Sequence, residues 1–298
     1  MTVLIATDMS DRSRQALRQA AWLAHFTKQA LHVLHVVEGL DDQYGWLVLL
    51  QTPEEIGQNV VAEQKAKLDA FVHETLDDFS HMDELHISQD IQVGEVIDVI
   101  VDLVDANDDI STVVCGAQGH TGFANYFIAS TPNELIRVAP CPVLIVPDVE
   151  GDMAIEKILV SVDLQPDSQF ILEHAKALAK SVGALVYPCF VIQWPQPMFD
   201  PLYAFTVATE NREEIRTHQK AALDALCEMA NLGDTLGQTF VLDGDIETTI
   251  QDTAKAIDAD LVLMGTHARR GLRRFVLGNM SERVLRSSPC SLYIVQGT

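Results

Sequence analysis

The feature that most constrains the fold of this chain is an internal repeat. Residues 3–17 (VLIATDMSDRSRQAL) align with residues 158–172 (ILVSVDLQPDSQFIL), each an apolar run followed by an aspartate and a polar turn. Three later landmarks recur in the same order, 149 to 150 residues apart: 93–100 with 243–250, 112–119 with 261–268, and 139–147 with 288–296. Coincidence would not preserve this order. The 298 residues therefore predict two tandem domains of one kind, 1–149 and 154–298, joined by a short polar linker.

Each half alternates short apolar runs with helix-forming stretches. In the first half the runs predict strands near 3–7, 32–37, 85–88, 112–115 and 143–146, with helices near 11–28, 55–79, 95–106 and 131–138. Strands separated by helix-length connections run parallel and are covered on both faces. We therefore expect an α/β fold with a doubly wound, five-stranded parallel sheet in each half. Because Pro188 removes a ladder donor from the second strand of the second half, that strand should be an edge strand or bulged.

The charge balance excludes some classes of function. The chain has 43 acidic and 20 basic residues, a net charge of -23, and such a field repels nucleic-acid backbones. No apolar stretch of about 20 residues could span a bilayer, and the N-terminus has no basic leader segment. We expect a soluble, cytoplasmic protein that binds neither nucleic acid nor membrane.

Cysteines and histidines show no pattern typical of a metal site. The five cysteines, at 115, 141, 189, 227 and 290, are scattered and form no CxxC pair. We expect reduced, mostly buried thiols. The histidines have no metal-ligand spacing either, and the sequence predicts neither a metal site nor a catalytic residue.

Three features of each half should meet at one end of its sheet. They are the aspartate after the first strand, the glycine after the fourth strand, and the start of the next helix: Asp8, Gly116 and Ala129-Ser130-Thr131, then Asp163, Gly265 and Gly278-Asn279. Ligands of open parallel sheets bind at the carboxyl ends of the strands. Glycine lets backbone amides approach phosphate oxygens, and a helix N-terminus offers unpaired donors. For Asp8 and Asp163 a helix N-cap role is an equal alternative to ligand contact, and Ser10 could serve as the cap equally well.

These residues resemble the universal stress protein family, in its tandem, UspE-like type. That family carries an aspartate after its first strand and the pattern G-x-x-G, nine residues, G-[ST] near its end. Here the first half has Gly116 and Gly119, nine residues, then Ala129-Ser130, and the second has Gly265 and Ala268, nine residues, then Gly278-Asn279. The resemblance covers both halves. It implies a Rossmann-like, HUP-type fold, with the halves packed as an internal pseudo-dimer.

The resemblance also implies a ligand, because ATP-binding members hold ribose and phosphates with this motif and place the aspartate near the adenine. ATP with Mg²⁺ is therefore the candidate cofactor. Ala129, Ala268 and Asn279 depart from the pattern, so the two halves should differ in affinity. The nucleotide-binding candidates are Asp8, Val36, Cys115, Gly116, Gly119, Ala129, Ser130, Thr131, Asp163, Met264, Gly265, His267, Gly278 and Asn279.

Two further regions have open interpretations. The loop after the second glycine motif is basic and carries the anion-binding candidates Arg269, Arg270, Arg273 and Arg274, although a solvated or salt-bridged loop is the alternative. Segments 38–54 and 193–209 are long insertions with aromatic and aliphatic residues. They favour packing against the other half or a partner, and a cover for an apolar ligand is the alternative.

The leading hypothesis for function is a non-catalytic stress-response or regulatory protein that binds a nucleotide or another small ligand in one half. Protein partners and a homodimer of the tandem chain are compatible with it. The alternatives are a weak nucleotide hydrolase and a carrier of an apolar, lipid-like ligand. Against an enzyme, no Walker lysine motif is present and no nucleophile, base and carboxylate group together in the sequence.

Overall fold

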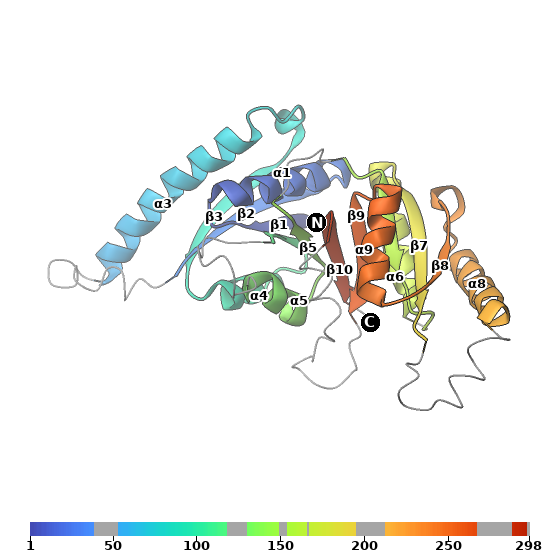
Figure 1. Cartoon of the computed structure of the whole chain (residues 1–298). Coiled ribbons are helices and arrows are strands. Elements are labelled where there is room, and N and C mark those ends of the chain that lie inside the picture. Colours follow the sequence, from blue (N-terminus) through green and yellow to red (C-terminus); the bar gives the residue numbers. More distant parts are fainter. Residues whose placement is uncertain are drawn as a thin grey trace. The chain divides into compact units, whose positions relative to one another are not determined.

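A computed structural model describes residues 1–38, 53–117, 130–148, 154–165, 167–194, 212–266 and 288–296. The chain divides into two compact units, the first covering Met1–Ala154 and the second beginning at Ile155. Each unit is an α/β body with its own sheet, and the fold class predicted from the sequence is confirmed (Figure 1). The predicted pseudo-dimer stays a prediction.

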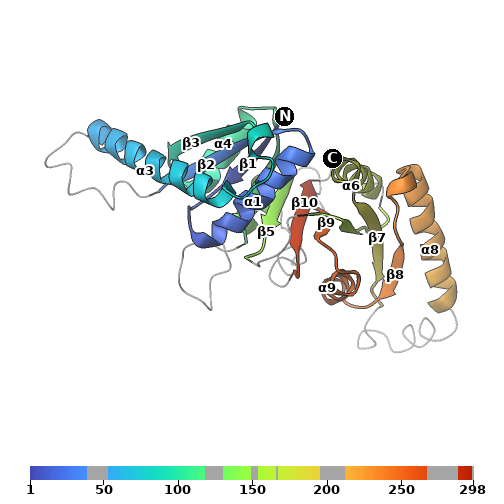
Figure 2. The ribbon, with the colours of Figure 1, turned by 90° about the horizontal axis from the view of Figure 1, so that it is seen from above.

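The first unit is built on five parallel strands in the order β3-β2-β1-β4-β5. The strands are β1 (Thr2–Ala6), β2 (Ala30–Val37), β3 (Ile87–Val93), β4 (Ile110–Gly116) and β5 (Val143–Val146). Helices α1 (Asp11–Phe26) and α3 (Pro53–Leu76) pack together on one face, and α4 (Val96–Asp105) and α5 (Ser130–Val138) on the other (Figure 1; Figure 2). A short 3-10 helix, η2 (Met82–Glu84), links α3 to β3.

The core of this unit explains why its central elements form. β1 reads TVLIA, and Val3, Leu4 and Ile5 are completely buried because helices cover both faces of the strand. One side of α1 presents small and branched residues to the sheet, among them Leu17 and Ala20, which are also completely buried. Burial of each large apolar side chain stabilises the fold by about 1.5–3 kcal/mol.

The second unit repeats this plan. Its strands are β6 (Lys157–Ser161), β7 (Leu185–Ile192), β8 (Phe240–Asp243), β9 (Leu261–Thr266) and β10 (Ser291–Gln296). They are parallel in the order β10-β9-β6-β7-β8. Helices α6 (Ser168–Val182) and α8 (Arg212–Met229) pack together, α9 (Ile246–Ile257) lies on the other face, and the 3-10 helix η3 (Gly233–Thr235) precedes β8 (Figure 2).

A glycine lies just before the helix that follows the third strand in each unit. Gly94 precedes α4 with φ +155°, and Gly244 precedes α9 with φ +151°. Each donates its amide to the end of the second strand of its unit, Gly94 to the Val37 carbonyl and Gly244 to that of Ile192. A residue with a Cβ rarely adopts this backbone conformation, so the repeated glycines follow from the turn.

The predicted third strand, 85–88, is wrong in extent, because β3 runs from Ile87 to Val93. β3 pairs only with β2 and is an edge strand of its unit's order. Its sequence, ISQDIQV, is half polar, and none of its residues is fully buried. Because β3 has no continuous apolar run, the predicted strand begins two residues before it and ends five residues short of its end.

The expectation for Pro188 is also wrong, since β7 lies between β6 and β8 and pairs with β6 without a register shift. The Val186 carbonyl accepts from Gly237, so backbone groups of every second residue, including Pro188, face the β8 side. The bridges Val186–Leu236 and Cys189–Phe240 span three residues on β7 (189 − 186) and four on its neighbour (240 − 236). The irregularity that accommodates the proline therefore lies beside β7, at 237–239.

Most of the two insertions, 38–54 and 193–209, lies outside the residues described above. At their ends, Glu38 Oε1 accepts from the Val96 amide at 3.4 Å, at the start of α4. The Arg212 guanidinium lies 4.9 Å from the centre of the Trp194 ring, a cation–π contact. In the described part of the chain no helix is both long and apolar enough to cross a membrane.

All five cysteines are free thiols, four of them buried, which confirms the expectation of reduced and mostly buried cysteines. Burial raises the pKa of Cys115, Cys189 and Cys290 to about 12, and that of Cys141 and Cys227 to about 11. The thiol, and not the reactive thiolate, is therefore the form present in the folded chain at neutral pH.

We expect native thiols to react with a disulfide reagent at pH 8 at least about a hundredfold more slowly than the thiols of the urea-unfolded chain. Stability should also fall in alkali. Because the pKa of the Cys115 thiol is higher in the folded chain, the thiol contributes to the free energy of unfolding. This contribution is complete below the ordinary thiol pKa of 9.0 and is lost as the pH rises toward about 12. Rapid native labelling of even one thiol would contradict this assignment.

Candidate functional site

The candidate site of the first unit lies where the strand order reverses. The chain passes from β1 to β2 and β3 on one side and then crosses to β4 and β5 on the other, so β1 and β4 are neighbours. Their register pairs Ile5 with Val114, which brings Gly116 level with the residue before Asp8. The sheet thus brings the predicted aspartate and glycine to one edge, at the crevice where ligands of open α/β sheets bind.

The loop between β1 and α1 is held by side chains of its own. Asp8 Oδ1 accepts from the Ser10 amide at 3.0 Å and from the Ser10 hydroxyl at 2.6 Å. Between them Met9 has φ +56°, an uncommon conformation for a non-glycine residue. Thr7 Oγ1 accepts from the Met9 amide at 3.0 Å and lies 2.9 Å from Ser13 Oγ. The carboxylate therefore fixes a tight turn at the end of the strand.

This geometry shows whether Asp8 is the N-cap of α1. The N-cap of α1 is Ser10, whose side chain makes no capping bond, and its carbonyl accepts from the Ser13 amide. The N-cap of α6 is Asp167. The N-cap alternative for Asp8 and Asp163 is therefore wrong, and both act as turn-forming carboxylates.

The second unit builds the same turn with different neighbours. Asp163 Oδ1 accepts from the Gln165 amide at 3.0 Å and from the Ser168 hydroxyl at 2.6 Å. Leu164 takes the left-handed position, with φ +58°. By the alignment of 3–17 with 158–172, Val162 and Gln165 replace Thr7 and Ser10. The turn is repeated, whereas the second unit has fewer hydroxyl groups around it.

The glycine that ends the fourth strand has a packing role in the second unit. A Cβ on Gly265 would lie 2.8 Å from Ile171 Cδ1 and 3.1 Å from Ile171 Cγ1, closer than carbon atoms approach. Ile171 belongs to α6 and is buried, so the bare glycine lets this helix sit directly on β9. The aligned residue of the first unit is Ala16, whose side chain ends at Cβ. The two crevices therefore differ in the space above this glycine.

The remaining described candidates contribute unequally. Val36 is half-buried near the end of β2, beside β1, and Thr131 is half-buried in the first turn of α5, which begins at Ser130. The side chains of Cys115 and Met264 are buried in the core, which leaves only their backbone for ligand contact. The other candidates lie outside the described residues: Gly119, Ala129, His267, Gly278, Asn279, Arg269, Arg270, Arg273 and Arg274.

The structure adds two residues to this end of the first unit that the sequence did not single out. His35 Nδ1 lies 2.8 Å from the Thr7 carbonyl, and because a carbonyl only accepts, Nδ1 carries the proton. Arg12, in the first turn of α1, lies 3.7 Å from Asp148, just beyond β5. Both side chains of that pair are about half exposed, so the guanidinium is a cation at the rim of the crevice. Neither His35 nor Arg12 belongs to a recognisable motif, and only the strand order brings them to this end of the sheet.

The sequence model of the universal stress protein family matches this chain twice, over residues 1–147 and 154–296. The chain belongs to the universal stress protein family. It is a stress-response protein of the tandem two-domain type, as the sequence predicted. It is similar to universal stress protein Slr1230 of Synechocystis, 24% identical with 96% of each chain covered. It is likewise similar to the universal stress protein E homolog of Haemophilus influenzae, 24% identical with 97% of this chain and 95% of the relative covered.

Solved structures agree on the fold. A universal stress protein from Archaeoglobus fulgidus superposes with a TM-score of 0.66 over 99% of this chain and 98% of its own, at 16% identity. A putative universal stress protein from Pseudomonas aeruginosa gives a TM-score of 0.63 over 99% and 93%, at 18% identity. At these identities the likeness establishes the arrangement of helices and strands.

We expect Gly265→Ala to lower the free energy of unfolding by about 1–3 kcal/mol, because the new methyl group overlaps Ile171. In an Ile171→Ala background, which reproduces the Ala16 of the first unit, the same change should cost less than about 0.5 kcal/mol. Urea unfolding of the four variants of this cycle measures the difference. An equal cost in both backgrounds would show that Gly265 has another role.

Proposed function

We propose that this universal stress protein is a non-catalytic regulator that binds a nucleotide in the crevice of its first unit. The observation that supports it is the meeting of Asp8 and Gly116 at the strand-order reversal between β1 and β4. Glycine at a strand end permits close approach of phosphate to the backbone, and a nearby carboxylate accepts hydrogen bonds from a base amine. A change in occupancy would then alter the conformation or the partners of the protein.

The surroundings of the turn favour the first unit over the second. Thr7, Ser10 and Ser13 line its β1–α1 turn with hydroxyl groups, whereas the second unit has Val162 and Gln165 in the first two of these places. Ala16 leaves space where Ile171 occupies it in the second unit. The first unit also keeps both glycines of the G-x-x-G pattern, Gly116 and Gly119. A crevice edged by hydroxyl groups suits a ligand with a base, a ribose and phosphates.

Phosphate binding would involve α5 and Arg12. α5 begins at Ser130, and the positive end of its helix dipole favours an anion there. Arg12, paired with Asp148 at the rim, is a second source of positive charge in a very acidic chain. Magnesium would enter as the counter-ion of the phosphates, and we assign no side chain to it.

Two polar groups of the described crevice are engaged in structural hydrogen bonds, which favours binding without turnover. Asp8 Oδ1 accepts from the Ser10 amide and hydroxyl in the turn. His35 directs its Nδ1 proton to the Thr7 carbonyl, which uses that nitrogen for structure. General acid–base chemistry needs a group within hydrogen-bond reach of the reacting atom.

The first experiment identifies what the protein carries. The chain is purified without added nucleotide and denatured, and the released small molecules are identified by mass spectrometry. Near-stoichiometric adenine nucleotide supports the proposal, and an apolar metabolite supports the alternative of a carrier. If the protein is empty, titration with a fluorescent ATP analogue measures weaker binding.

We expect Asp8→Ala and Gly116→Val to weaken nucleotide binding at least about tenfold, because the first loosens the turn and the second fills the approach to the backbone. The matched changes in the second unit, Asp163→Ala and Gly265→Val, should change it less than about twofold. Circular dichroism checks that each variant is folded. Loss of binding only in the second pair would move the site to the second unit, and no loss in either would refute this proposal. ATP hydrolysis that survives all four changes would come from a contaminant.

A further inference from the structure

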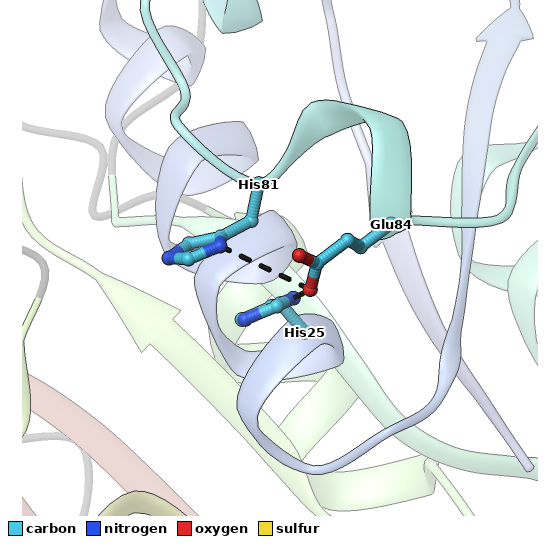
Figure 3. Close-up of side chains that lie close together, drawn as sticks. All are labelled: His25, His81 and Glu84. Atoms are coloured by element: carbon cyan, nitrogen blue, oxygen red, sulfur yellow. Dashed lines mark ion pairs between the residues drawn. The ribbon is translucent and has the colours of Figure 1, made fainter.

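Three potential metal ligands meet on the first unit, at the end of α1 distant from the crevice. His25 lies in the last turn of α1, and His81 and Glu84 belong to the 3-10 segment that links α3 to β3. Glu84 Oε2 lies 3.7 Å from His25 Nδ1 and 4.0 Å from His81 Nδ1. One ligand atom from each residue lies within 4.8 Å of the other two. Figure 3 shows the two imidazole rings one above the other and the Glu84 carboxylate directed toward both.

These distances are too long for hydrogen bonds and close to those of a coordination shell. Two atoms bound to the same tetrahedral zinc ion at 2.0–2.1 Å lie about 3.3 Å apart. The carboxylate therefore has to move toward each imidazole by well under 1 Å, whereas a direct hydrogen bond would require a separation of about 2.9 Å. Two imidazole nitrogens and a carboxylate oxygen suit Zn²⁺ and related divalent transition metals.

The imidazole rings are held in place by their neighbours. The rings of His25 and His81 stack with centres 4.0 Å apart and planes 13° from parallel. Phe26 lies edge-on to both, 4.9 Å from His25 and 6.1 Å from His81, and Phe79 lies edge-on at 6.4 and 6.0 Å. Stacked rings direct their nitrogens in parallel, so metal binding requires one ring to tilt. The terminal torsion of histidine is broad and permits this.

His81 has the space to tilt. It lines a pocket of about 240 Å³ together with Trp22, Phe26 and Phe79 and the ion pair of Arg18 and Asp78. Exposure rises from 15% for the His25 side chain to 39% for His81 and 68% for Glu84. A cation could therefore enter from the Glu84 side, and the solvent there could supply a fourth ligand. The C-terminal end of α1 also carries the negative end of the helix dipole, which favours a cation.

The second unit shows that the fold itself does not require these residues. Its corresponding 3-10 helix, η3, closes with the same backbone bond, Leu236 to Gly233, as Leu85 to Met82 in η2. The aligned positions there are Lys180 for His25, Leu232 for His81 and Thr235 for Glu84. A structural role for two stacked histidines and a carboxylate would have been needed in both units.

We propose that His25, His81 and Glu84 form a three-ligand binding site for a divalent transition metal, with Zn²⁺ as the representative ion. Binding would join the end of α1 to the α3–β3 connection and so stabilise the first unit, since an ion that binds only the folded chain raises its stability. This site is independent of the nucleotide proposal. The sequence predicted no metal site, because residues 25 and 81 are 56 apart and form no spacing motif.

The test is titration of the full chain, stripped of metal by chelation, with Zn²⁺ against a chromophoric zinc indicator. We expect one equivalent to be lost or weakened at least about tenfold in His81→Ala and in Glu84→Gln. The matched control is His73→Ala. His73 Nδ1 lies 3.9 Å from Asp77 on the same unit, both side chains are exposed, and no third ligand is near them in the described residues. His73→Ala should leave that equivalent unchanged.

A second readout separates coordination from a nonspecific effect of charge. The melting temperature of the wild-type chain should rise with Zn²⁺, and the rise should disappear in His81→Ala and Glu84→Gln but not in His73→Ala. Addition of Co²⁺ should give the visible absorption of a four-coordinate ion in the wild type, and this absorption should be absent from His81→Ala and Glu84→Gln. Failure of the wild type to bind Zn²⁺, or equal binding by wild type, His81→Ala and Glu84→Gln, would overturn the proposal.

Discussion

The hydrogen-bonded pairing of β1 with β4, repeated as β6 with β9, is the constraint on which the rest of each unit depends. These strands are neighbours in the sheet although two strands and three α-helices of the described residues separate them in the first unit's chain. Leu4, Ile5, Val113 and Val114 are completely buried, so the ladder lies in a dry core where an unmade backbone bond would be costly. The helices that follow the two strands, α1 and α5, lie on opposite faces of the sheet (Figure 1).

The sequence predicted best the parts that are buried on both sides. β1, α1, β4 and β5 are continuous apolar runs or a clear amphipathic stripe, and their observed positions match the expected ranges to within a few residues. β3 was misplaced because this edge strand is half polar and contains no continuous apolar run. Pro188 lacks a backbone donor toward β8 and not toward β6. Which of the two neighbouring strands it faces depends on the backbone orientation within the sheet, and the sequence does not contain that information.

The candidate site was predicted in its position and only partly in its chemistry. Asp8 and Gly116 do lie at the same sheet edge, because the carboxyl ends of parallel strands must do so. That Asp8 forms a turn with Ser10, and that the missing Cβ of Gly265 faces Ile171, are facts of three-dimensional packing. His25, His81 and Glu84 come from two segments that meet only because α3 returns its end to α1. No spacing rule detects such a cluster.

The two units have kept their ladders and turns while the side chains at functional positions have diverged, and this divergence separates the two proposed sites. α1 has 16 residues and is about 24 Å long at 1.5 Å per residue. Its first turn adjoins the crevice of Asp8, and its last turn carries His25. The length of α1 separates the two proposed sites. A metal ion at its last turn and a nucleotide at its first turn therefore share no ligand residue. A loss of zinc binding in His81→Ala therefore cannot arise from a damaged nucleotide crevice, and a loss of nucleotide in Gly116→Val cannot arise from the metal cluster.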